Sequence, residues 1–238
     1  MKQMYSVLLP LILTAGIFAT GCSEDTIDPV EVKPKVIFFH AAPDTAVQGV
    51  HLLVEGESVA LNHSFGNVTT YLDVASGTRN VKLVSSGTTN TIFEGIHRFE
   101  ESESYTLIAI NDGAGNADLL LFRDDLTTPA SGTALIRAAH LIFDAPKTRV
   151  ALKESGLGPL YDSLEFKQNS ESFVQAVPPN PYQVVRFMDA QLTGPGDTTG
   201  TGIDPILEEQ VTLEDGKIYT LAATGTTAAP SLTVIKHN

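Results

Sequence analysis

The chain carries one sequence pattern twice, and this repeat limits what it can fold into more than any other feature. Matched residues lie 100 positions apart early in the copies and 114 apart late in them: His40 with His140, Leu52 with Leu152, and Tyr105 with Tyr219. The second copy therefore holds additional residues. Most of them lie in segment 192–202, which is too rich in glycine for a core strand. We conclude that one domain occurs twice in tandem.

Each copy consists of short runs rich in β-branched and aromatic residues, such as 35–40 and 105–110, bounded by turn signals. Helical periodicity of useful length is missing. The pattern predicts an all-β protein with two tandem immunoglobulin-like Greek-key β-sandwiches. We place the first sandwich at residues 35–128, a linker at 129–133 and the second sandwich at 134–238.

An apolar segment before the copies ends at the only cysteine of the chain. Residues 7–18 are too short and too poorly flanked to span a bilayer as a mature helix. They lead to Ala19-Thr20-Gly21-Cys22, which resembles the lipobox of bacterial lipoproteins. The resemblance implies that residues 1–21 are a signal peptide cleaved after Gly21, and that Cys22 carries lipid. A buried or free thiol is the alternative.

The residues after Cys22 predict where the protein is anchored. Segment 22–34 is acidic and contains Pro29 and Pro34, so we expect a flexible tether. Ser23-Glu24-Asp25 resembles the signal that exports some Bacteroidota lipoproteins to the outer leaflet of the outer membrane. We expect a lipid-anchored outer-membrane protein at the cell surface, with the periplasmic face as the alternative.

The charge balance and the cysteine content exclude several kinds of partner and site. Without Lys2, the mature chain has 14 Lys+Arg against 28 Asp+Glu, which gives a net charge of −14. Such a surface repels nucleic acid and anionic headgroups, so the lipid at Cys22 must supply the membrane contact. Once Cys22 is acylated, no thiol remains for a disulfide, a thiolate metal site or a cysteine nucleophile. We expect no cofactor.

Two motifs resemble those of an extracytoplasmic family. The first copy contains His40-Ala41-Ala42-Pro43-Asp44 near its start, and the second contains Gly216-Lys217-Ile218-Tyr219-Thr220 near its end. Over residues 35–238 the chain is similar to the tandem domain of unknown function numbered four-three-nine-seven in its series. Ser102 stands where the family has glycine in the first copy. The resemblance implies an immunoglobulin-like fold and a surface location, and it implies no activity.

A histidine and an aspartate recur four residues apart, as His40 with Asp44 and as His140 with Asp144. An imidazole oriented by a carboxylate is half of a general-base site. The chain has no G-x-S-x-G, H-E-x-x-H or G-x-x-x-x-G-K-[ST] motif to supply the other half. We therefore interpret the histidines as framework residues that bond the turn after the first strand, with the aspartates capping that turn.

This interpretation favours a protein that is not an enzyme and that binds or spaces a protein or glycan partner. The alternative function is a carbohydrate-binding or adhesin-like surface module. Tyr105 and Tyr219 begin late strands, where Greek-key sandwiches carry a structural corner tyrosine, and ligand stacking is their alternative role. The oxygen-rich loop 112–118 fits either a calcium site or a Gly-rich hairpin, and we predict no metal.

Several Asp-Ser/Thr-apolar triplets resemble the sites at which Bacteroidota O-glycosylate envelope proteins. The hydroxyl residues in these triplets are Thr26, Thr45, Ser163 and Thr198. Thr26 and Thr198 lie in the most exposed contexts that the sequence offers.

Overall fold

A computed structural model describes most of the chain after the expected tether. The described residues are 32–43, 49–111, 114–153, 159–170, 173–175, 180–192 and 204–238. Residues 32–238 form one compact unit. Within the described residues, no helix has the length and apolar character needed to cross a membrane.

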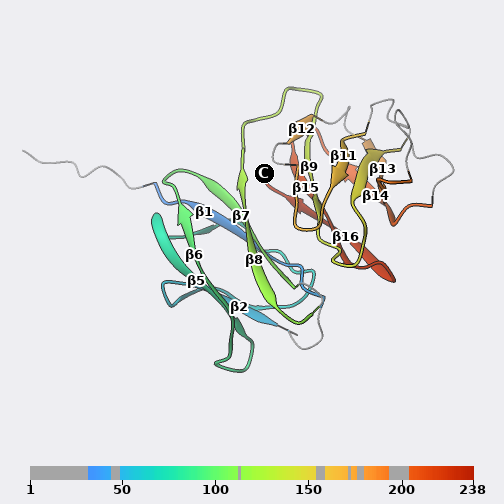
Figure 1. Cartoon of the computed structure of the whole chain (residues 1–238). Coiled ribbons are helices and arrows are strands. Elements are labelled where there is room, and N and C mark those ends of the chain that lie inside the picture. The colour runs from blue at the N-terminus through green and yellow to red at the C-terminus, as the bar shows by residue number, and fades with distance from the viewer. Residues whose placement is uncertain are drawn as a thin grey trace, which may run out of the picture. The chain divides into compact units, whose positions relative to one another are not determined.

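Within the described residues, the first half of this unit contains eight strands. Figure 1 draws them in colours from blue to light green. They are β1 (Lys35–His40), β2 (Val50–Val54), β3 (Glu57–His63), β4 (Leu72–Asp73), β5 (Gly77–Ser85), β6 (Thr91–Phe99), β7 (Ser104–Asn111) and β8 (Ala117–Asp124). One sheet has the order β4-β1-β7-β8 and the other β3-β2-β5-β6. The pair β1 and β7 is parallel, and the other pairs are antiparallel.

The second half repeats this arrangement eight strands later. Its strands are β9 (Leu135–His140), β10 (Thr148–Leu152), β11 (Tyr161–Leu164), β12 (Val174–Gln175), β13 (Asn180–Asp189), β14 (Leu207–Leu213), β15 (Ile218–Thr226) and β16 (Ala229–Lys236). The sheets are β12-β9-β15-β16 and β11-β10-β13-β14, and β9 runs parallel to β15. The sequence repeat is therefore a repeat of topology.

The all-β sandwich class is confirmed, but the strand order is not that of an immunoglobulin constant domain. That domain places its first, second, fifth and fourth strands in one sheet. Here β1 is occupied on both sides, by β4 and by β7. The second strand must therefore pair in the opposite sheet.

Each half has its own apolar core, and a third cluster joins the halves. Val36 and Phe38 of β1 belong to the core of the first half, whereas Ile37 and Phe39 belong to the third cluster. This cluster also contains Leu141 and Ile235 from the second half. β1 is therefore buried on both faces, which explains why its sequence is a continuous apolar run and does not alternate with polar residues. The domain boundaries 35–128 and 134–238 stay predictions.

Candidate functional site

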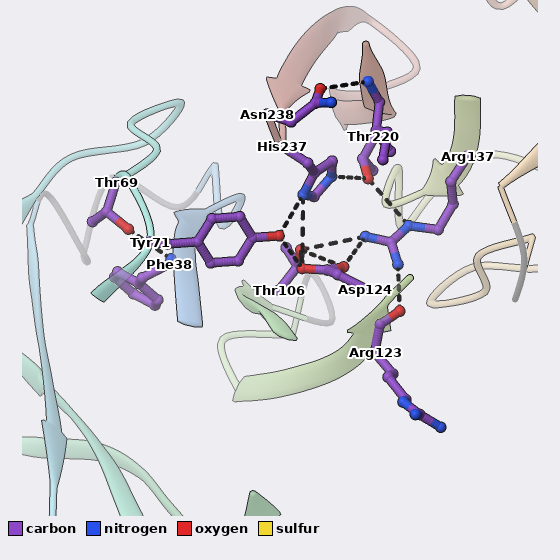
Figure 2. Close-up of polar contacts among 11 residues, drawn as sticks. Phe38, Thr69, Tyr71, Thr106, Arg123, Asp124, Arg137, Thr220, His237 and Asn238 are labelled. Carbon is purple, nitrogen blue, oxygen red and sulfur yellow. Dashed lines mark hydrogen bonds and ion pairs between the residues drawn. The ribbon is translucent and has the colours of Figure 1, made fainter. Parts of the chain in front are cut away.

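A buried ion pair joins the two halves. Asp124 ends β8, and Arg137 lies in β9, in the middle of an otherwise largely apolar strand. Their side chains are 0% and 1% exposed, and Arg137 Nη2 lies 2.7 Å from Asp124 Oδ1. Figure 2 shows both side chains pointing into a shared polar cluster. A charge buried this deeply requires a full set of partners.

Every nitrogen of the Arg137 guanidinium has an acceptor. Nε donates to the Thr220 hydroxyl at 3.1 Å, and Nη1 donates to the backbone carbonyl of Arg123 at 2.9 Å. The Thr106 hydroxyl lies 2.9 and 2.8 Å from the two Asp124 oxygens and donates to that carboxylate. The Phe173 ring lies 4.6 Å from the guanidinium carbon. The ion pair therefore has the additional bonds that offset the desolvation of both charges.

Tyr71 and His237 complete the cluster. The Tyr71 hydroxyl lies 2.8 Å from Asp124 Oδ2 and 2.9 Å from His237 Nδ1. His237 Nε2 lies 2.8 Å from the Thr220 hydroxyl. One assignment satisfies all contacts: Tyr71 donates to Asp124, neutral His237 donates to Tyr71, and Thr220 donates to His237.

Burial keeps both of these groups neutral. Desolvation lowers the pKa of His237 to about 4, against the opposing pull of Asp124. Desolvation and the adjacent Asp124 carboxylate raise the pKa of Tyr71 far above its ordinary value. The carboxylate of Asp124, the imidazole of His237 and the phenol of Tyr71 thus lie together in an arrangement that resembles an acid–base site. Because Asp124 and His237 are buried and fully bonded, the arrangement acts as a clamp between the halves.

The strand registers place members of the clamp at equivalent positions of the two halves. Ile37 pairs with Thr106 across β1 and β7, and Arg137 pairs with Thr220 across β9 and β15. The threonines are therefore equivalent and identical. The position of Ile37 in the first half is filled by Arg137 in the second.

The charged members show the same divergence. In the first half, Asp124 lies opposite Ser104. In the second half, the His237 amide donates to the carbonyl of Ile218, which is the residue equivalent to Ser104. Asp124 and His237 therefore occupy equivalent positions. The acid is thus in one half and the basic side chains are in the other. Docking one half against its own copy would set Asp124 against a second carboxylate, so the chemistry favours unlike halves.

A polar cleft of about 620 Å³ lies beside the clamp, where β8 leads into the connection between the halves. Its walls include Glu103, Arg123, Asp125, Thr127 and Phe173. Arg123 Nε donates to Glu103 at 2.9 Å, and Asp125 accepts the Thr127 amide at 2.9 Å. The charged groups that line the cleft are thus largely paired within the protein.

The predicted histidines bond the backbone near the ends of their strands. His140 Nε2 lies 3.0 Å from the Pro146 carbonyl, and desolvation lowers the pKa of this buried ring. His40 is also buried, and its Nδ1 accepts the Ala42 amide at 3.3 Å. The Asp144 carboxylate accepts the amide and the hydroxyl of Thr227, each at 2.8 Å, and so links the segment after β9 to the β15–β16 turn. Asp44 lies outside the described residues.

The two tyrosines occupy equivalent corners. The Tyr105 hydroxyl accepts the Glu100 amide at 3.0 Å, and the Tyr219 hydroxyl accepts the Glu214 amide at 3.1 Å. Both tyrosines are buried. In each half the hydroxyl ties the strand to the turn that precedes it, which is the geometry of a tyrosine corner.

The remaining sequence-based sites lie mostly outside the described residues, namely Gly21, Cys22, Thr26, Thr45, Thr198 and residues 112–113 of the oxygen-rich loop. Ser163 is exposed in β11. Asp118, at the end of the oxygen-rich loop, pairs with Lys167 at 2.8 Å. In the part of the chain that the structure describes, no three metal-ligating side chains gather.

Sequence reasoning missed the clamp. A signal was present, because Arg137 interrupts a buried apolar strand at the repeat position that Ile37 fills in the first copy. A cation at such a position indicates a buried partner. The partner, Asp124, follows from the packing of the two halves and from nothing local.

Comparison with known proteins gives a family and no activity. A family model described as a domain of unknown function, DUF4397, matches residues 14–151, which is more than half of the chain. Comparison with curated proteins gives no significant match.

Two solved structures of streptococcal proteins are remotely similar. One concerns alpha-glucan recognition by family 41 carbohydrate-binding modules from streptococcal virulence factors: identity 9%, coverage 81% of this chain and 94% of that one, TM-score 0.26. The other concerns alpha-glucan binding by a streptococcal virulence factor: identity 11%, coverage 79% and 93%, TM-score 0.25. Likenesses this remote transfer no property to the chain.

Proposed function

We propose that this chain, which belongs to the DUF4397 family of domains of unknown function, is a non-catalytic lipoprotein of the cell envelope. It presents two β-sandwiches as one rigid body that binds a partner or holds it at a distance from the membrane. The partner is a protein or a glycan.

The clamp is the observation that carries this proposal. Asp124 and His237 form the arrangement that most resembles an acid–base site, and both are buried in contacts between the halves. The third apolar cluster covers the same interface. A joint with both a core and a fully bonded ion pair resists bending, which suits a spacer or a fixed binding platform.

Attachment to the membrane rests on Cys22 and the acidic segment after it. Acylation at Cys22 would hold the protein through several chains, and a single chain binds only marginally. Ser23-Glu24-Asp25 supports the outer leaflet of the outer membrane as the address.

Replacing Cys22 by serine should abolish acylation and release the protein from membranes. Cells labelled with a palmitate analogue and then fractionated would report both effects. Thr26→Ala, which keeps the cysteine, serves as the control and should stay labelled and sedimentable. A parent protein that is unlabelled and soluble would contradict the lipoprotein proposal.

The rigid joint predicts one narrow distance distribution between the halves. Spin labels at Leu61→Cys and Tyr182→Cys, in a Cys22→Ser background, place one probe on an exposed position of each half. Labels at Leu61→Cys and Val32→Cys, both at exposed positions of the first half outside β6, give the width that the labels themselves produce. We expect the two widths to agree. A much broader distribution between the halves would refute the rigid spacer.

A carbohydrate-binding or adhesin-like function would use the cleft beside the clamp. Its hydroxyls and carboxylates suit a polar ligand, and Phe173 is the aromatic ring in its wall. That ring already stacks on the Arg137 guanidinium, so one face is unavailable to a sugar. Because the Phe173 ring is already occupied by Arg137, we favour the spacing or protein-binding function over sugar binding.

A further inference from the structure

We propose that two copies of this chain associate through strand β6, forming one continuous sheet across a two-fold axis. β6 spans nine residues at the edge of the sheet β3-β2-β5-β6. Among the described residues, no strand forms backbone hydrogen bonds with the edge of β6 that points away from β5. Such an edge offers a row of backbone donors and acceptors to a second strand.

The outer face of β6 carries three exposed side chains in alternation. The register with β5 pairs Val81 with Gly95 and Leu83 with Phe93, so the odd-numbered residues of β6 face the core. Glu94, Ile96 and Arg98 therefore face outward, and all three are exposed. Ile96 is 65% exposed, an unusual position for an isoleucine in the middle of a strand.

When two β6 strands pair edge to edge, these side chains complement those of the second copy in one antiparallel register. If the two-fold axis passes through Ile96, Ile96 meets its own copy and Glu94 lies opposite Arg98 of the second chain. The axis generates the same pair twice, which gives two opposite-charge pairs around an apolar contact. Directly opposed pairs of this kind stabilise antiparallel strands.

Neighbouring registers are less favourable. An axis through Glu94 or through Arg98 would set like charges directly opposite each other, which is destabilising. An axis through His97 would set Glu94 against Glu100. An axis through Gly95 would set Glu94 against Ile96. The charges thus select the register centred on Ile96.

The equivalent edge of the second half lacks this pattern. β14 exposes Glu208, Gln210 and Thr212 on the equivalent face, and β14 itself contains no cation that could oppose Glu208 of a second copy. Glu208 is already paired with Lys153 and Arg186. The two halves therefore differ at an edge that the repeat makes topologically equivalent.

Existing contacts of the β6 charges do not prevent the pairing. Arg98 pairs with Glu100 on the surface, with side chains 67% and 56% exposed. Glu94 lies 3.1 Å from Lys82, with side chains 48% and 35% exposed. Exposed pairs of this kind contribute little and exchange readily.

Disulfide trapping tests the predicted axis. In the full chain carrying Cys22→Ser, Ile96→Cys places the single thiol on the axis, where directly opposite Cβ atoms lie about 4.5–5.5 Å apart, close to disulfide geometry. Leu61→Cys, on the opposite edge of the same sheet and 55% exposed, is the matched control. Under mild oxidation in detergent we expect a covalent dimer for Ile96→Cys and monomer for Leu61→Cys. Equal yields from the two variants would overturn the proposal.

Charge reversal gives an independent test by sedimentation, without any cysteine. Glu94→Arg or Arg98→Glu alone opposes like charges, and each should weaken dimerisation on the order of tenfold. The double variant Glu94→Arg/Arg98→Glu restores both pairs and should restore the dimer. Thermal unfolding verifies that each variant is folded. A parent that stays monomeric, or a double variant no tighter than the singles, would overturn the proposal; neither result bears on the membrane anchor.

Discussion

Replacing Arg137 by methionine should lower the free energy of unfolding by about 3–5 kcal/mol, the usual effect of removing one partner of a buried ion pair. Methionine fills most of the apolar volume but leaves the buried Asp124 carboxylate without its cation. The thermal midpoint should fall by roughly 10 °C for a chain of this size. Urea unfolding at neutral pH, followed by far-UV circular dichroism, measures the change.

Two controls separate the buried charge from simple truncation. Lys35→Met breaks an exposed ion pair with Asp73, whose side chains are 52% and 57% exposed, and should have little effect. Arg137→Met/Asp124→Leu removes both charges and should recover part of the lost stability, because the Tyr71 and Thr106 hydroxyls lose Asp124 as their acceptor. If Arg137→Met is no worse than Lys35→Met, the clamp does not hold the halves together.

Acidification should destabilise the protein through His237 before the carboxylates titrate. Its pKa is about 4 in the folded protein, against 6.5 in a solvated chain. Between these values the unfolded chain binds a proton that the folded protein does not, so stability falls as the pH falls. Because one proton is involved, the free energy of unfolding should fall by about 2 kcal/mol between pH 7 and pH 4.5. Burial lowers the pKa of His140 as well, and its effect adds in the same direction.

His237→Gln tests the source of this dependence. Glutamine keeps hydrogen-bonding groups near Tyr71 and Thr220 but does not titrate. The variant should be less stable than the parent at pH 7 and should lose less stability on acidification. Urea unfolding measured at half-unit steps from pH 7 to pH 4.5 gives both slopes. Parallel slopes for parent and variant would assign the acid sensitivity to other groups.

Both predictions concern an interface built from duplicated positions. The repeat supplies identical threonines, Thr106 and Thr220, on the two facing sheets. Substitution at the positions around them then places the acid in one half and the basic side chains in the other. The result is a pairing of unlike halves, which supports the proposal that the duplicated sandwich acts as one rigid body.

Features that depend on local pattern could be predicted from the amino-acid sequence alone. Runs of β-branched and aromatic residues bounded by turn residues predicted the strands, and the spacing of the copies predicted two topologically equivalent halves. The position of Tyr105 and Tyr219 at the start of late strands predicted a hydroxyl bond to nearby backbone, and both bonds are present. These contacts join residues close in sequence, so short-range spacing is enough to locate them.

The strand order, the third apolar cluster and the clamp could be established only from the folded structure. Parallel pairing of β1 with β7 joins segments about 70 residues apart, and no local pattern distinguishes it from the immunoglobulin order. The clamp depends further on which outer sheet face of each half is covered by the other. That choice turns Arg137 from a surface cation into a buried partner of Asp124, because burial removes the water that would otherwise solvate both charges.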